Sequence, residues 1–137
     1  MKKQFYIVKG LVECNGKYLV LKRKFGLEFD AGKWECSGGK IRENEKPEQT
    51  FIRELFEETG LNTKKVREIS VLEGETDLVK SKCHVFFTKV DSRKVKLGED
   101  HIAYKWIKPE NFKNLELATF ADLLTEYFNN PKKYLTI

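Results

Sequence analysis

Residues 38–61 read GGKIRENEKPEQTFIRELFEETGL and hold the pattern that decides the fold. Two glycines open the stretch, which predicts a tight loop before the more regular segment that follows. Pro47 suits the first position of a helix, and Gly60 suits the position just after one. The spacing therefore predicts a helix over 47–59 that is entered from a glycine-containing loop.

Three glutamates share one face of the predicted helix. At about 100° per residue, Glu54, Glu57 and Glu58 fan across this face, and Glu58 falls at the margin of the apolar stripe. Charge is costly in such a place, and clustered carboxylates repel one another, so the group needs a cation. Hard oxygen ligands in this number favour Mg²⁺ or Mn²⁺. Arg53, one helical turn before Glu57, would take up part of the negative charge and orient a carboxylate.

The distribution of charge also favours a cation site in this stretch. Residues 39–61 hold six acidic and four basic side chains, a net charge of −2. The whole chain has 26 basic and 21 acidic residues and a net charge of +5, so the remainder carries +7. An acidic site within a basic body suits a metal-dependent enzyme that acts on phosphates. The alternative interpretation is a solvated, glutamate-rich helix stabilised by Glu/Arg pairs.

The rest of the chain predicts one domain that mixes strands and helices. A length of 137 residues leaves room for a single domain, 1–137. Alternating or apolar stretches predict strands over 4–13, 17–24, 66–73, 83–90 and 104–107, and a second helix is expected over 118–128. Interspersed strands and helices predict an α/β or α+β fold in which helices cover a mixed sheet.

Composition indicates where the protein resides. No apolar run approaches the roughly 18 residues that cross a bilayer, and the first residues lack a signal-peptide core. Cys14, Cys36 and Cys83 are odd in number and form no CxxC pair, which argues against a disulfide framework or a thiolate zinc site. We therefore expect a cytoplasmic protein with no membrane partner.

The predicted helix and its approach match a known signature at every fixed position. The signature is G-x5-E-x7-R-E-U-x-E-E-x-G-U, where U is aliphatic. The matching residues here are Gly39, Glu45, Arg53, Glu54, Leu55, Glu57, Glu58, Gly60 and Leu61. The chain thus resembles the Nudix hydrolases, with the Nudix box at 39–61, and is similar in length and element order to a small, MutT-like member. This resemblance implies an α/β/α sandwich around a mixed sheet.

The resemblance also implies a reaction and a set of metal ligands. Members of the family hydrolyse a nucleoside diphosphate linked to another group, with a divalent metal that is usually Mg²⁺; Mn²⁺ is the alternative. Carried over to matching positions, Glu54, Glu57 and Glu58 would bind the metal together with the Gly38 carbonyl. Arg53 would orient a glutamate, and Glu45 would support the loop.

The general base stays open among three acids. Relatives use a glutamate of the box or a carboxylate outside it, so Glu54 and Glu57 are candidates together with Glu99. The segment 98–101 followed by Trp106 resembles an E-H…W segment found after the box in many relatives, although Glu99 is equally well explained as a surface acid. We expect His101 to make local hydrogen bonds and Trp106 to lie in the core.

Basic and aromatic residues supply candidates for the substrate side. Arg23, within Lys22–Lys24, and Lys40 are expected to meet substrate phosphate, although an exposed strand end explains Lys22–Lys24 equally well. Phe25 and Phe29 precede the box and are candidates for stacking on a base, although core packing is the commoner role of an aromatic ring.

The resemblance favours a (deoxy)nucleoside triphosphate as substrate, giving a monophosphate and pyrophosphate. Residues 76–79 lack the Pro or Tyr that often marks relatives selective for ADP-ribose or dinucleoside polyphosphates. The alternative function is a catalytically weak nucleotide- or nucleic-acid-binding module on a Nudix scaffold. A thiol hydrolase using Cys36 with His84 or His101 is less favoured, because no orienting third group accompanies it. Nucleic acid is not a required partner, and either a monomer or a homodimer fits.

Overall fold

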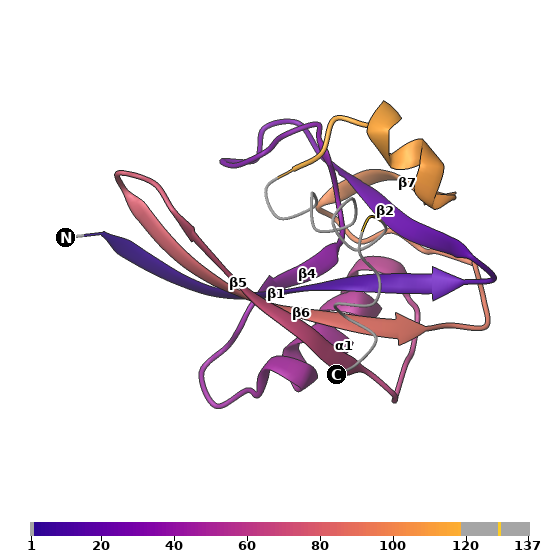
Figure 1. Ribbon diagram of the computed structural model, residues 1–137, viewed down its shortest axis with the longest axis horizontal. Coiled ribbons are helices and arrows are strands. Elements are labelled where there is room, and N and C mark those ends of the chain that lie inside the picture. The colour runs from indigo at the N-terminus through magenta and orange to yellow at the C-terminus, as the bar shows by residue number, and fades with distance from the viewer. Residues whose placement is uncertain (1, 119–128, 130–137) are drawn as a thin grey trace.

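A mixed seven-stranded sheet with one long helix packed on it forms the body of the protein. The computed structural model describes residues 2–118 and 129. The strands are β1 (Lys3–Cys14), β2 (Lys17–Arg23), β3 (Trp34–Glu35), β4 (Ser37–Lys40), β5 (Arg67–Glu75), β6 (Val79–Lys89) and β7 (His101–Ile107). The helix α1 spans Pro47–Thr59, and a 3₁₀ turn, η1, spans Pro109–Asn114 (Figure 1).

The sheet divides into two halves along β1 and β2. These strands pair antiparallel beside their connecting turn, at Glu13 with Tyr18 and at Cys14 with Lys17. Beyond those pairs β1 is flanked by β4 and by the parallel strand β6, whereas β2 is flanked by β3 and β7. The two strands thus separate along their length, and the segment that contains β3 and β4 passes from one half to the other.

Local signals explain why α1 begins and ends where it does. Lys46, a poor capping residue, donates its backbone N–H to the Gln49 side chain at 2.9 Å, which satisfies one end of the helix. Gly60 adopts a left-handed φ of 75° and donates its N–H to the Phe56 carbonyl at 2.8 Å. Glycine takes this conformation without the steric cost that other residues incur. The helix has the bounds that the sequence predicts.

Apolar side chains attach α1 to one face of the sheet. Phe51 and Leu55 are fully buried and pack among residues of β1, β2 and β6. The Phe51 ring stacks on that of Phe86 with centroids 5.6 Å apart. Leu11, Val20, Trp34 and their neighbours form a second cluster. Because α1 is fixed in this way, the glutamates of its last turns are carried against β4.

The predicted fold class is confirmed as a mixture of helix and strand around a mixed sheet. The five predicted strands are present, with longer bounds for most of them, but β3 and β4 were missed because strands of two and four residues carry no readable alternation. The second helix, expected over 118–128, lies outside the described residues except for Ala118. Within the described ranges, no helix is long and apolar enough to cross a membrane.

Candidate active site

The glutamates at the end of α1 lie against the loop that contains β4. Glu58 accepts hydrogen bonds at the same oxygen, Oε1, from the Ser37 hydroxyl at 2.7 Å and from the Gly38 N–H at 2.9 Å. Glu54 lies so close to Gly39 that a Cβ there would come within 2.5 Å of its carboxyl carbon. A glycine at position 39 is therefore needed for the helix to bring Glu54 to this loop.

Arg53 holds the acidic side chains of the box together. Its Nε and Nη2 donate to the two oxygens of Glu45 at 2.7 and 3.0 Å, and its Nη1 donates to Glu54 at 3.0 Å and to Glu57 at 3.1 Å. The Arg53 hydrogen bonds hold the pKa of the Glu45 carboxyl at about 2. The guanidinium thus fixes Glu54 and Glu57 from one side and attaches the helix to the preceding loop.

Burial changes the acidity of two of the three glutamates on this face. Burial raises the pKa of Glu58 to about 7, despite the opposing charge of Lys9. Burial also raises the pKa of Glu54, which Arg53 offsets in part. Glu57 has a side chain that is 50% exposed. The ionised forms of Glu54 and Glu58 therefore need more positive charge than the protein supplies nearby, and a divalent cation would provide it.

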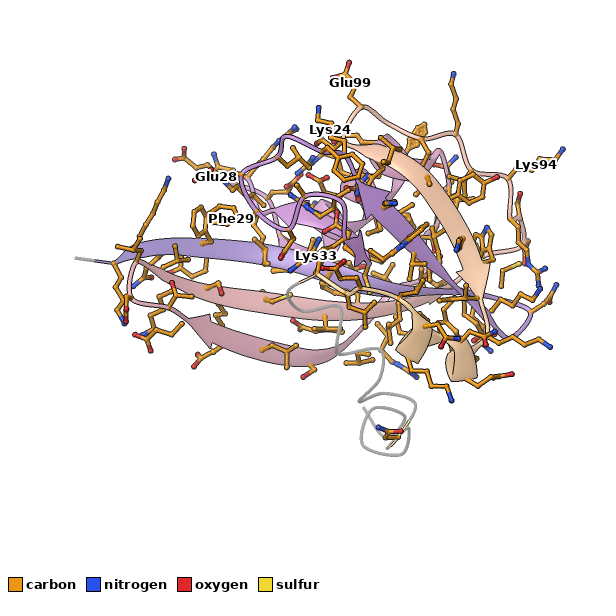
Figure 2. All side chains as sticks on the ribbon, turned by 90° about the horizontal axis from the view of Figure 1, so that it is seen from above. Lys24, Glu28, Phe29, Lys33, Lys94 and Glu99 are labelled. Carbon is orange, nitrogen blue, oxygen red and sulfur yellow. The ribbon has the colours of Figure 1, made fainter. Side chains whose placement is uncertain are left out.

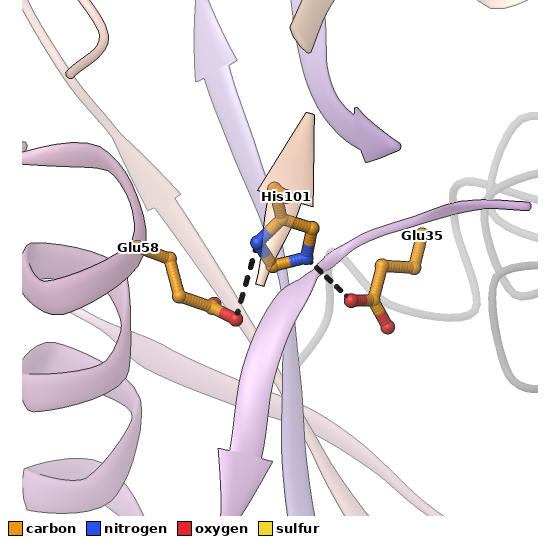
Figure 3. A group of neighbouring side chains, drawn as sticks. All are labelled: Glu35, Glu58 and His101. Carbon is orange, nitrogen blue, oxygen red and sulfur yellow. Dashed lines mark hydrogen bonds and ion pairs between the residues drawn. The ribbon is translucent and has the colours of Figure 1, made fainter. Parts of the chain in front are cut away.

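A buried network of charges fills the space where the two halves of the sheet separate. Glu35 of β3 accepts hydrogen bonds from Lys9 of β1 at 2.6 Å, from Arg23 of β2 at 3.0 and 3.2 Å, and from His101 Nε2 at 2.6 Å. Burial disfavours the charge on Glu35, but Lys9 and these hydrogen bonds hold its pKa at about 2. The opposite edge of the His101 ring faces Glu58, with Nδ1 3.8 Å from Oε2 (Figure 3).

Sequence reasoning missed two members of this network, Lys9 and Glu35. Each interrupts a run of apolar residues, Lys9 within IVKGLV and Glu35 between Trp34 and Cys36. A charge at an inward position of a buried strand is unusual without a partner, and two such charges of opposite sign were the available signal.

The predicted substrate-side residues lie around these acids. Arg23 is held by Glu35 and donates its Nε to the Phe29 carbonyl at 3.0 Å. Lys40 follows the glycine loop, and its Nζ lies 4.7 Å from the centre of the Phe5 ring. Phe29 is 52% exposed and packs edge-on against Phe5. Both basic residues are thus close to the loop that contacts the glutamates.

Other sequence candidates lie outside the cluster. Glu99 is exposed in the turn before β7, and Figure 2 shows it extending outward from the molecule. The neighbouring Asp100 pairs with Lys24 at 3.4 Å. Cys36 is buried, while His84 pairs with Glu68 on the β5–β6 ladder. His101, the other histidine of the thiol alternative, lies between Glu35 and Glu58, so both histidines contact glutamates.

The donor set fits a hard divalent cation. Ser37 and Gly38 both donate to Oε1 of Glu58, so Oε2 can bind a cation. Glu54 and Glu57 add carboxylates from the same helix. Glu35 also comes within 4.8 Å of Glu58 and His101 ligand atoms, but both of its oxygens are engaged by Lys9, Arg23 and His101. Glu35 is thus already engaged by three partners, which leaves the glutamates of α1 as the candidates for binding a cation.

A carboxylate cluster held by an arginine at the end of one helix faces a glycine loop of a mixed sheet, an arrangement that suits a metal-dependent hydrolase. The family model described as NUDIX domain matches residues 6–128. The chain therefore belongs to the Nudix family, and it is a pyrophosphohydrolase that acts on nucleoside diphosphate-linked compounds.

Relatives and solved structures resemble nearly the whole chain. Nucleoside triphosphatase NudI of Escherichia coli O139:H28 is 26% identical over 126 residues, which cover 84% of this chain and 89% of that protein. The MutT protein from Methanosarcina mazei Go1 is 28% identical, with a TM-score of 0.81 and coverage of 96% and 97% of the two chains. The E. coli ORF135 protein is 26% identical, with a TM-score of 0.76 and coverage of 99% and 96%.

Proposed function

We propose that this protein hydrolyses a (deoxy)nucleoside triphosphate to the monophosphate and pyrophosphate with the help of Mg²⁺. The observation that carries the proposal is the placement of Glu58, a largely buried carboxylate with one oxygen fixed by Ser37 and Gly38 and the other left for a cation. The likeness to a nucleoside triphosphatase from E. coli supports the choice of substrate. No Pro or Tyr marker of other substrate classes occurs in residues 76–79.

The glutamates of α1 would have two roles, to bind the metal and to accept a proton. Glu54, Glu57, Glu58 and the Gly38 carbonyl would hold the metal, which when bound neutralises phosphate charge and acidifies a water molecule. Arg53 holds Glu54 and Glu57 in fixed orientations, since its Nη1 donates to both. One of these two carboxylates then accepts the proton of the attacking water.

A comparison of two variants separates the proton acceptor from a metal ligand. Glu54→Gln and Glu57→Gln each remove one negative charge and keep the size of the side chain. Both variants lose a proposed ligand and should bind Mn²⁺ more weakly, but the variant that also lacks the general base should lose more turnover at saturating Mn²⁺ than the other. Titration with Mn²⁺ next to single-turnover kinetics distinguishes the two. Equal and unchanged turnover in both variants would contradict these roles.

The substrate side is proposed to lie at Lys40, Arg23 and Phe29. Lys40 would contact a phosphate beside the glycine loop, and the exposed Phe29 ring offers a surface for the base. We predict that Phe29→Ala raises KM about 10-fold for the preferred nucleotide and leaves kcat nearly unchanged, because stacking on an aromatic ring is worth roughly 1–3 kcal/mol. Steady-state kinetics with that nucleotide measures both constants. A fall in kcat at constant KM would argue against a base contact.

The function itself is tested by following pyrophosphate release from a panel of ribo- and deoxyribonucleoside triphosphates with and without Mg²⁺. We expect release that needs Mg²⁺ and that Glu57→Gln reduces by orders of magnitude. Glu43→Gln, which removes an exposed glutamate from the loop before α1, serves as the matched control and should retain activity. Absence of Mg²⁺-dependent release from every nucleotide would overturn the proposal.

A further inference from the structure

We infer that His101 Nδ1 is a ligand of the divalent cation that Glu58 binds, so that this site contains a nitrogen ligand besides its carboxylates. The inference rests on the proposed function, since Glu58 is one of the metal ligands proposed there. It adds a residue from β7, far from the box in the sequence, to the metal site. Four observations carry it: the burial of the ring, the state of Nδ1, the support of Nε2 and the distance to Glu58.

The His101 ring is buried and has one unused nitrogen. Its side chain is 1% exposed. Within the described part of the chain, Nδ1 is a buried polar atom with no hydrogen-bond partner. Such an atom costs stability unless a ligand, an ion or a water molecule satisfies it. Nδ1 faces Glu58 of α1, as the view of the three side chains shows (Figure 3).

The other ring nitrogen is fixed by an anchored carboxylate. Nε2 lies 2.6 Å from Glu35 Oε2, and Glu35 also binds Lys9 and Arg23. A carboxylate that holds two cations is ionised and accepts, so Nε2 carries the hydrogen. In the neutral ring, the form that binds a metal, Nδ1 then presents a lone pair to Glu58. A carboxylate that orients the far nitrogen of an imidazole is the usual support of a histidine that binds a metal.

The distance between Nδ1 and Glu58 suits a shared ion better than direct contact. The two atoms are 3.8 Å apart, which is too long for a hydrogen bond. Ligand nitrogens and oxygens lie about 2.0–2.2 Å from a transition metal, so two ligands of one ion are at most about 4.3 Å apart. Two electron-rich atoms at such a separation repel each other unless a cation lies between them.

Nearby positive charge does not exclude an ion here. Lys9 and Arg23 both form ion pairs with Glu35, which also accepts a hydrogen bond from His101. The charge of Lys9 also acts on Glu58, but among the described residues the only ion-pair contact of Glu58 is with His101 at 3.8 Å, and its hydrogen bonds from Ser37 and Gly38 come from neutral groups. The charge of Glu58 is thus available to a cation.

A nitrogen ligand makes a specific prediction about metal preference. Imidazole suits late transition ions such as Zn²⁺ best; Mn²⁺ also prefers oxygen, but as a transition ion it accepts imidazole more readily than Mg²⁺ does. Removal of Nδ1 should therefore weaken Mn²⁺ binding more than Mg²⁺ binding. We expect His101→Gln to lower Mn²⁺ affinity about 10- to 100-fold with a smaller effect on Mg²⁺. Glutamine keeps an N–H that can reach Glu35 while nothing replaces Nδ1.

Pulsed EPR of the Mn²⁺-loaded protein tests the inference without measuring activity. The wild type should show coupling of Mn²⁺ to a ¹⁴N nucleus, and labelling with ¹⁵N-histidine should change the coupling to that of ¹⁵N. His101→Gln should abolish it. His84→Gln is the matched control, because His84 also pairs with a glutamate, Glu68, and should keep the coupling. The isotope experiment needs no variant, so a poorly folded His101→Gln leaves the test intact.

The outcomes separate this inference from the proposed function. Bound Mn²⁺ without nitrogen coupling would overturn the inference even if the enzyme releases pyrophosphate with Mg²⁺. Coupling that persists in His101→Gln would also overturn it. Nitrogen coupling in a protein that hydrolyses no nucleotide would support the metal site and overturn the function instead.

Discussion

Glu58 shows how a single residue can be placed for function at a cost to stability. The sequence puts it at the margin of the apolar stripe of α1, and the structure buries it against Ser37 and Gly38. Its folded-state pKa of about 7 lies above the ordinary value of 4.5. The native state therefore holds a proton more tightly than the unfolded state, and metal-free stability should fall as the pH rises from 4.5 to 7.

We predict that Glu58→Gln stabilises the metal-free protein at pH 8 and abolishes most of its activity. The amide carries no charge and keeps an oxygen for Ser37 and Gly38, so the gain is about 3 kcal/mol at most. Urea unfolding with a chelator present measures it, and the gain should vanish near pH 4.5. Glu43→Gln removes an exposed charge and should change little. A less stable Glu58→Gln protein at pH 8 would contradict the prediction.

Arg53 is predicted to need its guanidinium and not only its charge. It binds Glu45 through two nitrogens and Glu54 and Glu57 through a third. Lysine has one ammonium group and cannot reproduce this pattern. We expect Arg53→Lys to lower kcat by about 10- to 100-fold with unchanged circular dichroism. Arg42→Lys, in an exposed pair 3.9 Å from Glu57, should have almost no effect.

At the scale of elements, local signals in the sequence were sufficient for α1 and insufficient for the network beside it. Pro47 and Gly60 fix the two ends of the helix through the backbone of nearby residues. Lys9 and Glu35 come together because β1 and β2 separate, which depends on pairings between distant segments. His101, expected to make local hydrogen bonds, instead contacts glutamates of β3 and α1. No local pattern specifies such contacts.

The Glu35 network is predicted to join the two halves of the sheet in a pH-dependent way. The folded-state pKa of Glu35 is about 2, below the ordinary 4.5, so its stabilisation is full above pH 4.5 and is lost as the pH falls through 2. Glu35→Gln leaves Lys9 buried without its partner and should cost about 3–5 kcal/mol at pH 7.

Urea unfolding at pH 7, 4 and 3 measures this cost, and the difference between variant and wild type should shrink across that range. Glu75→Gln breaks the exposed pair with Lys2 and provides the matched control, which should show no comparable effect. A difference that stays constant with pH would mean that Glu35 contributes through packing rather than through its charge.

For the whole molecule, the distribution of charge affects how strongly a polyanionic substrate is attracted to the site. The box carries −2 within a chain of net +5, so the remainder of the chain carries +7. The acidic cluster is thus part of a body with positive net charge. Such a field raises the local concentration of an anion and so acts on binding more than on the chemical step.

We therefore predict that KM rises several-fold between about 0.05 and 0.5 M KCl at constant free Mg²⁺, while kcat changes by less than about two-fold. The Debye length falls from roughly 14 Å to 4 Å over this range, which screens the lysines from an approaching nucleotide. Steady-state kinetics in KCl and in choline chloride of equal ionic strength would separate screening from a specific effect of K⁺. A KM that is independent of salt would show that contacts within the site, rather than the charge of the whole protein, govern substrate capture.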